Sequence, residues 1–246
     1  GVLSVSDPTF DLGEILRGGL DREPVIKNRA DVVRAGFERA GGSLDRLPYT
    51  AEETEAIRSA FGSEEVVALQ ELDATEQNVR EAVGGDHRYL HLATHGLVNE
   101  RRGSMYASLA LTPVSGTDPE PDNDGFLELH EVYALDLGSI ALAVLSACKT
   151  NVGESYAGEG VFALSRGFLA AGAQRVVATQ WQVDDRATAV LIGHFFEVIA
   201  EAERAGETVD YARALRDAKL RVRNDVDNPH WADPYYWAAF TITGQR

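Results

Sequence analysis

The sequence predicts an α/β fold in which a central, mostly parallel sheet is flanked by helices. Short apolar runs rich in β-branched residues alternate with segments of helical periodicity, and this alternation is typical of βαβ units. The runs are apolar at nearly every position, which indicates strands buried on both faces of a sheet. With 246 residues, 44% of them hydrophobic, the chain can bury a full core. We therefore expect a single domain over residues 1–246.

Apolar runs bounded by turn residues predict the strands, and helical periodicity predicts the helices between them. The expected strands are Val2–Ser6, Val66–Leu69, Tyr89–Ala93, Ile140–Ala147, Arg175–Trp181 and Ala239–Thr243, with Ala107–Thr112 as a hairpin or edge strand. The expected helices are Arg29–Ala40, Glu52–Phe61, Glu76–Val83, Gly160–Ala171, Arg186–Ile199 and Tyr211–Arg223. Thr75 is placed to cap the third helix, and Gly172 to end the fourth. The segment Thr112–Gly125 is rich in Pro, Gly and Asp, which predicts a surface loop.

Composition excludes several classes of function. A formal net charge of −16 and a pI near 4.7 repel phosphate backbones, so nucleic acid is not an expected partner, and basic proteins or peptides are favoured. A single cysteine permits no intramolecular disulfide, which favours a reduced, cytoplasmic setting. No stretch approaches the roughly 18 apolar residues of a membrane span, so no membrane partner is expected.

The single cysteine, Cys148, follows the apolar run Ile140–Ala147 and precedes a polar, glycine-containing stretch. Ligands and reactive groups of parallel sheets gather at the carboxyl ends of the strands, where this residue is expected. A lone cysteine after a strand is also often a small buried hydrophobe. Its position alone leaves both interpretations open.

A histidine at the end of another predicted strand favours the reactive interpretation. His95 lies 53 residues before Cys148, and caspase-type proteases place a histidine about fifty residues before their cysteine, although their local signature differs. In such a pair the thiolate attacks a peptide carbonyl and the imidazole manages the proton. The backbone N–H groups of Gly96 and Cys148 could stabilise the oxyanion, since Gly96 has no Cβ to obstruct the substrate.

Rival chemistries fit the sequence less well. His91 and His95 are four residues apart, but the zinc motif with this spacing requires a helix and an adjacent Glu, and no further ligands lie nearby. We therefore expect no metal and no cofactor, and a structural, hydrogen-bonded role for His91. No G-x-S-x-G, Walker or G-x-G-x-x-G motif follows a predicted strand, which disfavours serine hydrolases and nucleotide-binding proteins.

Several segments, in order along nearly the whole chain, resemble the CHAT domain family. They are LHLATHG, SLALTP, VLSACKTNVGE, GEGVFALSRGFLAAGAQRVVATQWQVDDRAT and PYYWAAFTITG. The resemblance implies a caspase-like three-layer sandwich of the separase and clan CD type, with a His–Cys dyad at the positions of His95 and Cys148. The reasoning from the residues selects the same pair.

The resemblance also implies a biological setting. Some CHAT proteins are coupled to tetratricopeptide repeats and act as defence-associated proteases, including ones switched on by a CRISPR effector and ones that cleave gasdermins. It therefore implies a regulatory partner or repeat domain, on the same or another chain, in a bacterial stress or antiphage defence pathway. The sequence contains no such repeat, so we expect an excised catalytic domain or a naturally short protein.

Three acidic residues at predicted strand ends are candidates for an S1 pocket that selects Lys or Arg. They are Asp7, Asp184 and Asp185, and Trp181 is a candidate apolar wall of the pocket. In caspase-like folds the loop in the place of TQWQVDD forms part of the S1 wall. Asp184 is equally suited to cap the following helix, and Asp7 precedes a proline turn.

The function expected from these observations is that of a cysteine endopeptidase that cleaves a protein partner after Lys or Arg. Two alternatives stay open. One is a catalytically idle caspase-like scaffold or binding module, and the other is a non-proteolytic thiol acyltransferase or amidase that uses the same dyad.

Overall fold

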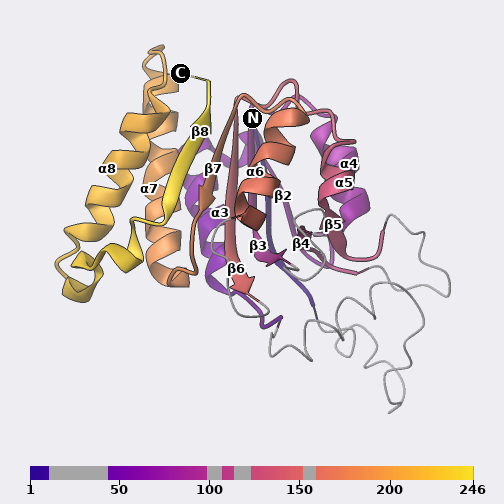
Figure 1. The fold of residues 1–246 in the computed structure, drawn as a ribbon. Helices are drawn as coiled ribbons and strands as arrows, with labels where there is room; N and C mark the ends of the chain where they lie inside the picture. Colours follow the sequence, from indigo (N-terminus) through magenta and orange to yellow (C-terminus); the bar gives the residue numbers. More distant parts are fainter. Residues whose placement is uncertain (11–43, 99–106, 114–122, 152–158, 246) are drawn as a thin grey trace.

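The computed structural model describes residues 1–10, 44–98, 107–113, 123–151 and 159–245, with the backbone alone at residues 98, 147–151 and 159–161. Within these ranges the chain forms one twisted sheet with helices on both faces (Figure 1). The predicted helix Arg29–Ala40 and most of the predicted loop Thr112–Gly125 lie outside the described residues.

The described elements follow the predicted alternation of strands and helices. In chain order they are β1 (Val2–Pro8), α3 (Tyr49–Phe61), β2 (Val66–Glu71), α4 (Glu76–Val83), β3 (Tyr89–Val98), β4 (Ser108–Ala110), β5 (Phe126–Glu128), α5 (Leu129–Val132), β6 (Leu142–Asn151), α6 (Glu159–Ala170), β7 (Arg175–Thr179), α7 (Asp185–Arg204), α8 (Tyr211–Arg223) and β8 (Phe240–Gly244). Short 3-10 helices occupy Ser63–Glu65, Pro229–Ala232 and Pro234–Tyr236. Each predicted strand is confirmed, as is each predicted helix that falls on described residues.

The strands of the sheet run in the order β2-β1-β3-β6-β7-β8. The neighbours from β2 to β7 are parallel, and β8 is antiparallel to β7. The short strand β4 pairs antiparallel with the last part of β3, and β5 pairs with β4. This topology confirms the mostly parallel sheet and the hairpin or edge position predicted for Ala107–Thr112.

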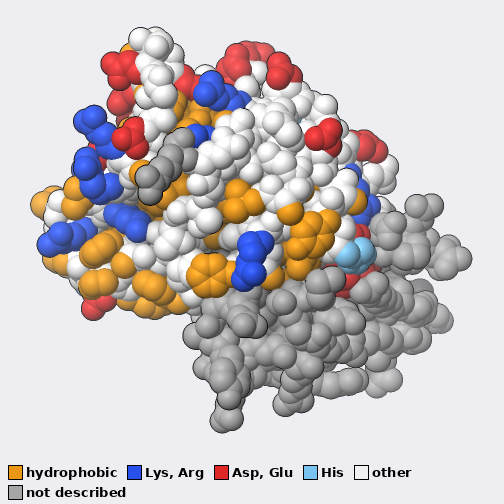
Figure 2. All heavy atoms as spheres, turned by 45° about the horizontal axis from the view of Figure 1, so that its top comes forward, with side chains coloured by type: hydrophobic (Ala, Val, Ile, Leu, Met, Phe, Trp, Pro, Cys, Tyr) orange, Lys and Arg blue, Asp and Glu red, His pale blue; other side chains and the backbone are white. Residues whose placement is uncertain are grey.

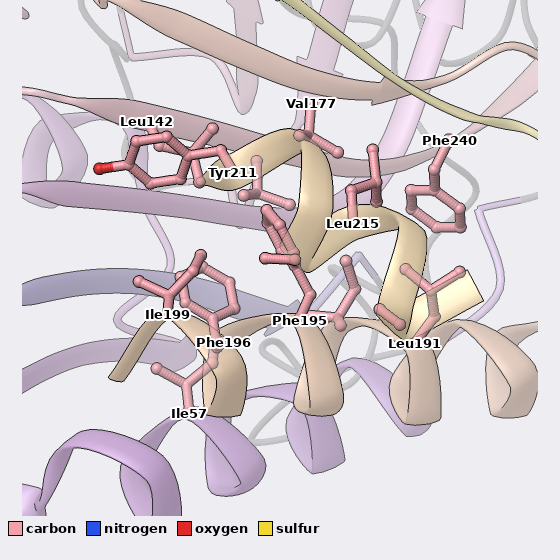
Figure 3. Close-up of a cluster of buried hydrophobic side chains, with 14 of the residues drawn as sticks. Ile57, Leu142, Val177, Leu191, Phe195, Phe196, Ile199, Tyr211, Leu215 and Phe240 are labelled. Carbon is pink, nitrogen blue, oxygen red and sulfur yellow. The ribbon is translucent and has the colours of Figure 1, made fainter. Parts of the chain in front are cut away.

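Two hydrophobic clusters explain why the strands are apolar at successive positions. Tyr89 packs in the cluster under α3, α7 and α8, whereas the next residue, Leu90, packs in the cluster under α4, α5 and α6. Figure 3 shows the first cluster, where Phe195 and Phe196 of α7 lie between the sheet and the neighbouring helices. Both side chains are fully buried, and burial of a side chain of this size contributes about 1.5–3 kcal/mol.

Helix ends form where local chemistry predicts them. The Thr75 hydroxyl accepts a hydrogen bond from the N–H of Asn78 at 3.2 Å and caps α4. After α6 the N–H of Ala173 donates to the carbonyl of Phe168, and Gly172 has φ +117°. This is the hydrogen bond of a Schellman motif, in which glycine is favoured because the backbone has positive φ.

β3 and β6 are longer than predicted. The apolar runs ended at Ala93 and Ala147, which placed His95 and Cys148 just after the strands; this boundary was wrong. The two strands pair without interruption from Tyr89 opposite Leu142 to the last residues of both. Ladder hydrogen bonds are made by the backbone, so the strands can continue after the apolar side chains stop.

The surface carries charges of both signs. Figure 2 shows one face of the molecule, on whose described part acidic and basic side chains are both present. The excess of negative charge is not gathered there into one patch. Among the described helices, none is long and apolar enough to cross a bilayer.

Candidate active site

The two residues of the predicted dyad are direct neighbours in the sheet. His95 on β3 is the register partner of Cys148 on β6, although 53 residues separate them in sequence. Neighbouring strands lie about 4.8 Å apart. The backbones of the two residues are therefore side by side near the carboxyl edge of the sheet, where β3 and β6 end (Figure 1).

The His95 imidazole is buried and held in one tautomer. Its side chain is 5% exposed, and its ring lies 5.1 Å from the ring of Phe10. The Nε2–H group donates a hydrogen bond to the carbonyl of Asp45 at 2.7 Å. Because a carbonyl only accepts, Nε2 carries the hydrogen and Nδ1 keeps its lone pair. Nδ1 is buried without a hydrogen-bond partner among the described residues.

Burial also lowers the pKa of His95 below its usual range, and its contacts with Asp45 oppose this shift only in part. The lower pKa favours the neutral imidazole near pH 7. A neutral ring with an unoccupied Nδ1 is suited to accept a proton from a thiol.

Gly96 lies inside the ladder. Its register partners are Lys149 on β6 and Leu109 on β4. An oxyanion role for Gly96 therefore requires that a substrate carbonyl reach its N–H between two paired strands.

Asp7, next to the last residue of β1, forms an ion pair. Its side chain is 3% exposed, and the guanidinium of Arg46 donates two hydrogen bonds to it, from Nε to Oδ1 at 2.9 Å and from Nη2 to Oδ2 at 2.6 Å. This candidate for the S1 pocket is already paired with a cation of its own chain.

The other three S1 candidates follow β7. Asp184 caps α7, because its Oδ1 accepts a hydrogen bond from the N–H of Ala187 at 2.9 Å. Asp185 is partly buried, and within the described residues its carboxylate has no hydrogen bond or ion pair. Burial, then the charges of Glu53 and Asp184, raise its pKa to about 6. Trp181 is 39% exposed and donates a hydrogen bond from Nε1 to the carbonyl of Tyr235 at 3.2 Å.

The sequence matches the CHAT domain family over residues 5–245. The chain belongs to the CHAT domain family. The match and the observed sheet confirm the predicted fold class, and this family is one of caspase-like cysteine peptidases.

A comparison of this sequence with curated proteins finds no significant match. Among solved structures, the CHAT domain is similar to the Arg specific cysteine proteinase gingipain R (RGPB), with 11% sequence identity and a TM-score of 0.49. The similarity covers 83% of this chain and 42% of the gingipain chain. This chain therefore spans less than half the length of the gingipain chain.

A buried polar network on the strands that carry His95 and Cys148 was not predicted from the sequence, apart from the structural role of His91. The fully buried His91 donates from Nε2 to Glu53 Oε2 at 2.8 Å, and the hydroxyl of Ser146, two residues before Cys148, donates to Glu53 Oε1 at 3.2 Å. His91 Nδ1 accepts from the Ser4 hydroxyl at 2.8 Å. From there hydrogen bonds continue through Thr54, Ser6 and Gln70.

This network crosses β2, β1, β3 and β6 and ties them to α3. The polar residues within the apolar strands were a signal that such a network exists. The acceptor that joins His91 and Ser146, Glu53, lies on helix α3, so the strand pattern did not indicate it. Across the described part of the CHAT domain, no cluster of three or more His, Cys, Asp or Glu side chains could hold a metal ion.

Proposed function

We propose that this CHAT domain is a cysteine endopeptidase in which His95 and Cys148 form the catalytic dyad. The observation that carries the proposal is the register between β3 and β6, which pairs the only cysteine of the chain with a buried histidine. The tautomer of that histidine supports it, because Nδ1 is the nitrogen that can accept a proton.

In the proposed reaction, His95 Nδ1 removes the proton of the Cys148 thiol, and the thiolate attacks the carbonyl carbon of the scissile peptide. The tetrahedral intermediate collapses when the imidazolium gives this proton to the leaving amine, which leaves an acyl-enzyme. Water then attacks the thioester carbonyl with Nδ1 again as the base, the C–S bond breaks to release the carboxylic acid product, and the imidazolium returns its proton to the Cys148 thiolate. The N–H groups of Cys148 and Gly96 are the proposed oxyanion donors.

For substrate selection we propose that Asp185 binds Lys or Arg at the P1 position. Asp7 is paired with Arg46 and Asp184 caps α7, whereas Asp185 is uncommitted. Its carboxylate is partly buried and faces the negative charges of Glu53 and Asp184, and both effects raise its pKa. A substrate cation would offset both the burial of this carboxylate and the repulsion by its acidic neighbours. Trp181, four residues earlier, would cover the aliphatic part of such a side chain.

The proposed substrate is a protein. Its proposed setting is a regulated bacterial stress or antiphage defence pathway in the cytoplasm, with a regulatory partner or repeat domain. This part of the proposal rests on the resemblance to CHAT proteins rather than on the geometry of the site.

Cleavage of a fluorogenic peptide library varied at P1 tests the proposal. We expect turnover at Lys and Arg that disappears in Cys148→Ala and in His95→Ala. Turnover that survives Cys148→Ala would contradict the dyad. Thiol-dependent hydrolysis of esters or amides without peptide cleavage would favour the acyltransferase or amidase, and no thiol chemistry at all would favour the scaffold.

The variant Asp185→Asn tests the specificity. We expect a loss of roughly 10- to 100-fold in kcat/KM for Lys and Arg at P1, since a hydrogen bond to a charged group contributes about 1.5–3 kcal/mol. Peptides with a neutral P1 residue should be unaffected. The matched control is Asp86→Asn, because Asp86 is exposed at the opposite edge of the sheet, just before β3. Equal losses for basic and neutral peptides would contradict an S1 role.

A further inference from the structure

We infer that Arg46 and Asp7 are positioning residues for His95, because their ion pair holds the carbonyl of Asp45 against the imidazole. The inference rests on the proposed dyad. It gives Asp7 a role in aligning the base rather than in binding the substrate.

The ion pair has the geometry of a rigid clamp. Two parallel hydrogen bonds, at 2.9 Å and 2.6 Å, join the planar guanidinium of Arg46 to the carboxylate of Asp7. Such a two-bond contact fixes orientation as well as distance. The Asp7 carboxylate is buried, whereas Arg46 is 64% exposed, so the arginine reaches inward from the surface to the end of β1.

A second carboxylate holds the same guanidinium from the neighbouring strand. Arg46 Nη2 also donates to Glu71 Oε1, at the end of β2, at 3.2 Å. Asp7 and Glu71 have φ values of +48° and +49°, a left-handed conformation that residues other than glycine rarely adopt. Strained backbone of this kind persists only where the surroundings enforce it. A strained acid at or next to the end of each strand therefore pairs with one arginine.

A hydrogen-bonded turn fixes the following residues to the same strand end. The N–H of Asp7 donates to the Thr50 hydroxyl at 2.8 Å, and that hydroxyl donates to the carbonyl of Leu47 at 2.7 Å. The N–H of Thr50 donates to the same carbonyl at 3.0 Å. Arg46 is thus anchored through its side chain, and Leu47 through its backbone.

The anchoring reaches the imidazole through one peptide plane. The carbonyl that accepts the His95 Nε2–H belongs to Asp45, and it shares a planar peptide group with the N–H of Arg46. Holding Arg46 against Asp7 therefore limits how that carbonyl can turn. As long as it accepts from Nε2, Nδ1 stays the unprotonated nitrogen that the proposed reaction needs.

The rate at which iodoacetamide alkylates the thiol tests the inference without knowledge of the substrate. Cys148 is the only cysteine, so the signal has one source, and the reagent is neutral. The full chain is compared as wild type, His95→Ala, Arg46→Ala, Arg46→Lys and Asp7→Asn. The matched control is Arg58→Ala, since Arg58 forms a surface ion pair with Glu55 on α3.

We expect His95→Ala, Arg46→Ala and Asp7→Asn each to slow alkylation at pH 7 by about tenfold, because only the thiolate reacts with the reagent and His95 is the base that forms it. The pH profiles of these variants should move towards that of a free thiol. Arg46→Lys keeps the charge but loses the two-bond contact. Its alkylation rate should therefore lie between those of the wild type and Arg46→Ala, and its folding should be near normal. Arg58→Ala should match the wild type.

The outcomes separate this inference from the proposed function. Normal alkylation in His95→Ala would remove the dyad and the inference with it. Slow alkylation in His95→Ala, with wild-type rates and pH profiles in Arg46→Ala and Asp7→Asn, would overturn the inference alone. If Arg46→Ala and Asp7→Asn lower Tm but leave the pH profile of alkylation unchanged, the Arg46–Asp7 ion pair only stabilises the fold, and the inference is wrong. With peptide substrates we expect Asp7→Asn to lower kcat at every P1 residue; a rise in KM confined to Lys and Arg would assign Asp7 to the substrate instead.

Discussion

Glu76, at the start of α4, should make the stability of this protein fall as pH rises. Its side chain is fully buried, and neither carboxylate oxygen has a hydrogen-bond partner among the described residues. Burial, then the charges of Glu131 and Asp124, raise its pKa from 4.5 to about 8. Arg80 opposes the shift, but its Nη2 lies 3.8 Å from Glu76 and only 2.5 Å from Glu131.

The direction and size of the effect follow from this pKa. Between pH 4.5 and about 8 the folded protein keeps a proton on Glu76 that the unfolded chain has released. The stability that protonated Glu76 allows is therefore complete below pH 4.5 and is lost as pH rises through about 8. At 1.36 kcal/mol for each pKa unit, the free energy of unfolding should lose about 3–5 kcal/mol between pH 5 and pH 9.

The variant Glu76→Gln removes this titration, and urea unfolding at pH 5, 7 and 9 measures it. The difference between variant and wild type should shift in favour of the variant by about 3–5 kcal/mol from pH 5 to pH 9. A constant offset from the buried amide does not affect this change. Glu81→Gln, an exposed position on the same helix, is the control. A difference that stays constant within about 1 kcal/mol would refute the reasoning.

Three further predictions concern the site and its support. Since the pKa of Asp185 is raised to about 6, the ratio of kcat/KM for basic to neutral P1 peptides should fall as pH drops through about 6, because protonation of His95 lowers both values alike; profiles measured from pH 5 to 8 should show no such fall in the ratio for Asp185→Asn. Glu53→Ala leaves two buried donors without an acceptor and should lower the free energy of unfolding in urea by about 3 kcal/mol, whereas the exposed Glu55→Ala should not. Gly172→Ala should lower Tm more than Gly206→Ala: both have positive φ, but a Cβ on Gly172 would lie 2.8 Å from backbone, whereas one on Gly206 meets nothing within 4 Å.

Local features of the fold were predictable because their causes lie within a few residues. Thr75 caps α4 through a residue three positions later, and Gly172 ends α6 within one turn. The strand core was equally readable, because burial on both faces requires an apolar side chain at nearly every position. The strand ends were not: β3 and β6 continue through polar residues because each strand provides backbone partners for the other.

The sequence by itself determined the alternation of strands and helices, the helix caps and the choice of His95 and Cys148 as candidates. Only the tertiary structure placed those two residues side by side. It also distinguished the three acidic candidates by their contacts, although Asp184 and Asp185 are adjacent in sequence. It also supplied the Asp45 carbonyl at Nε2 of His95. Contacts of this kind join residues dozens of positions apart, and strand order and register decide them. Neither leaves a periodic pattern in the local sequence.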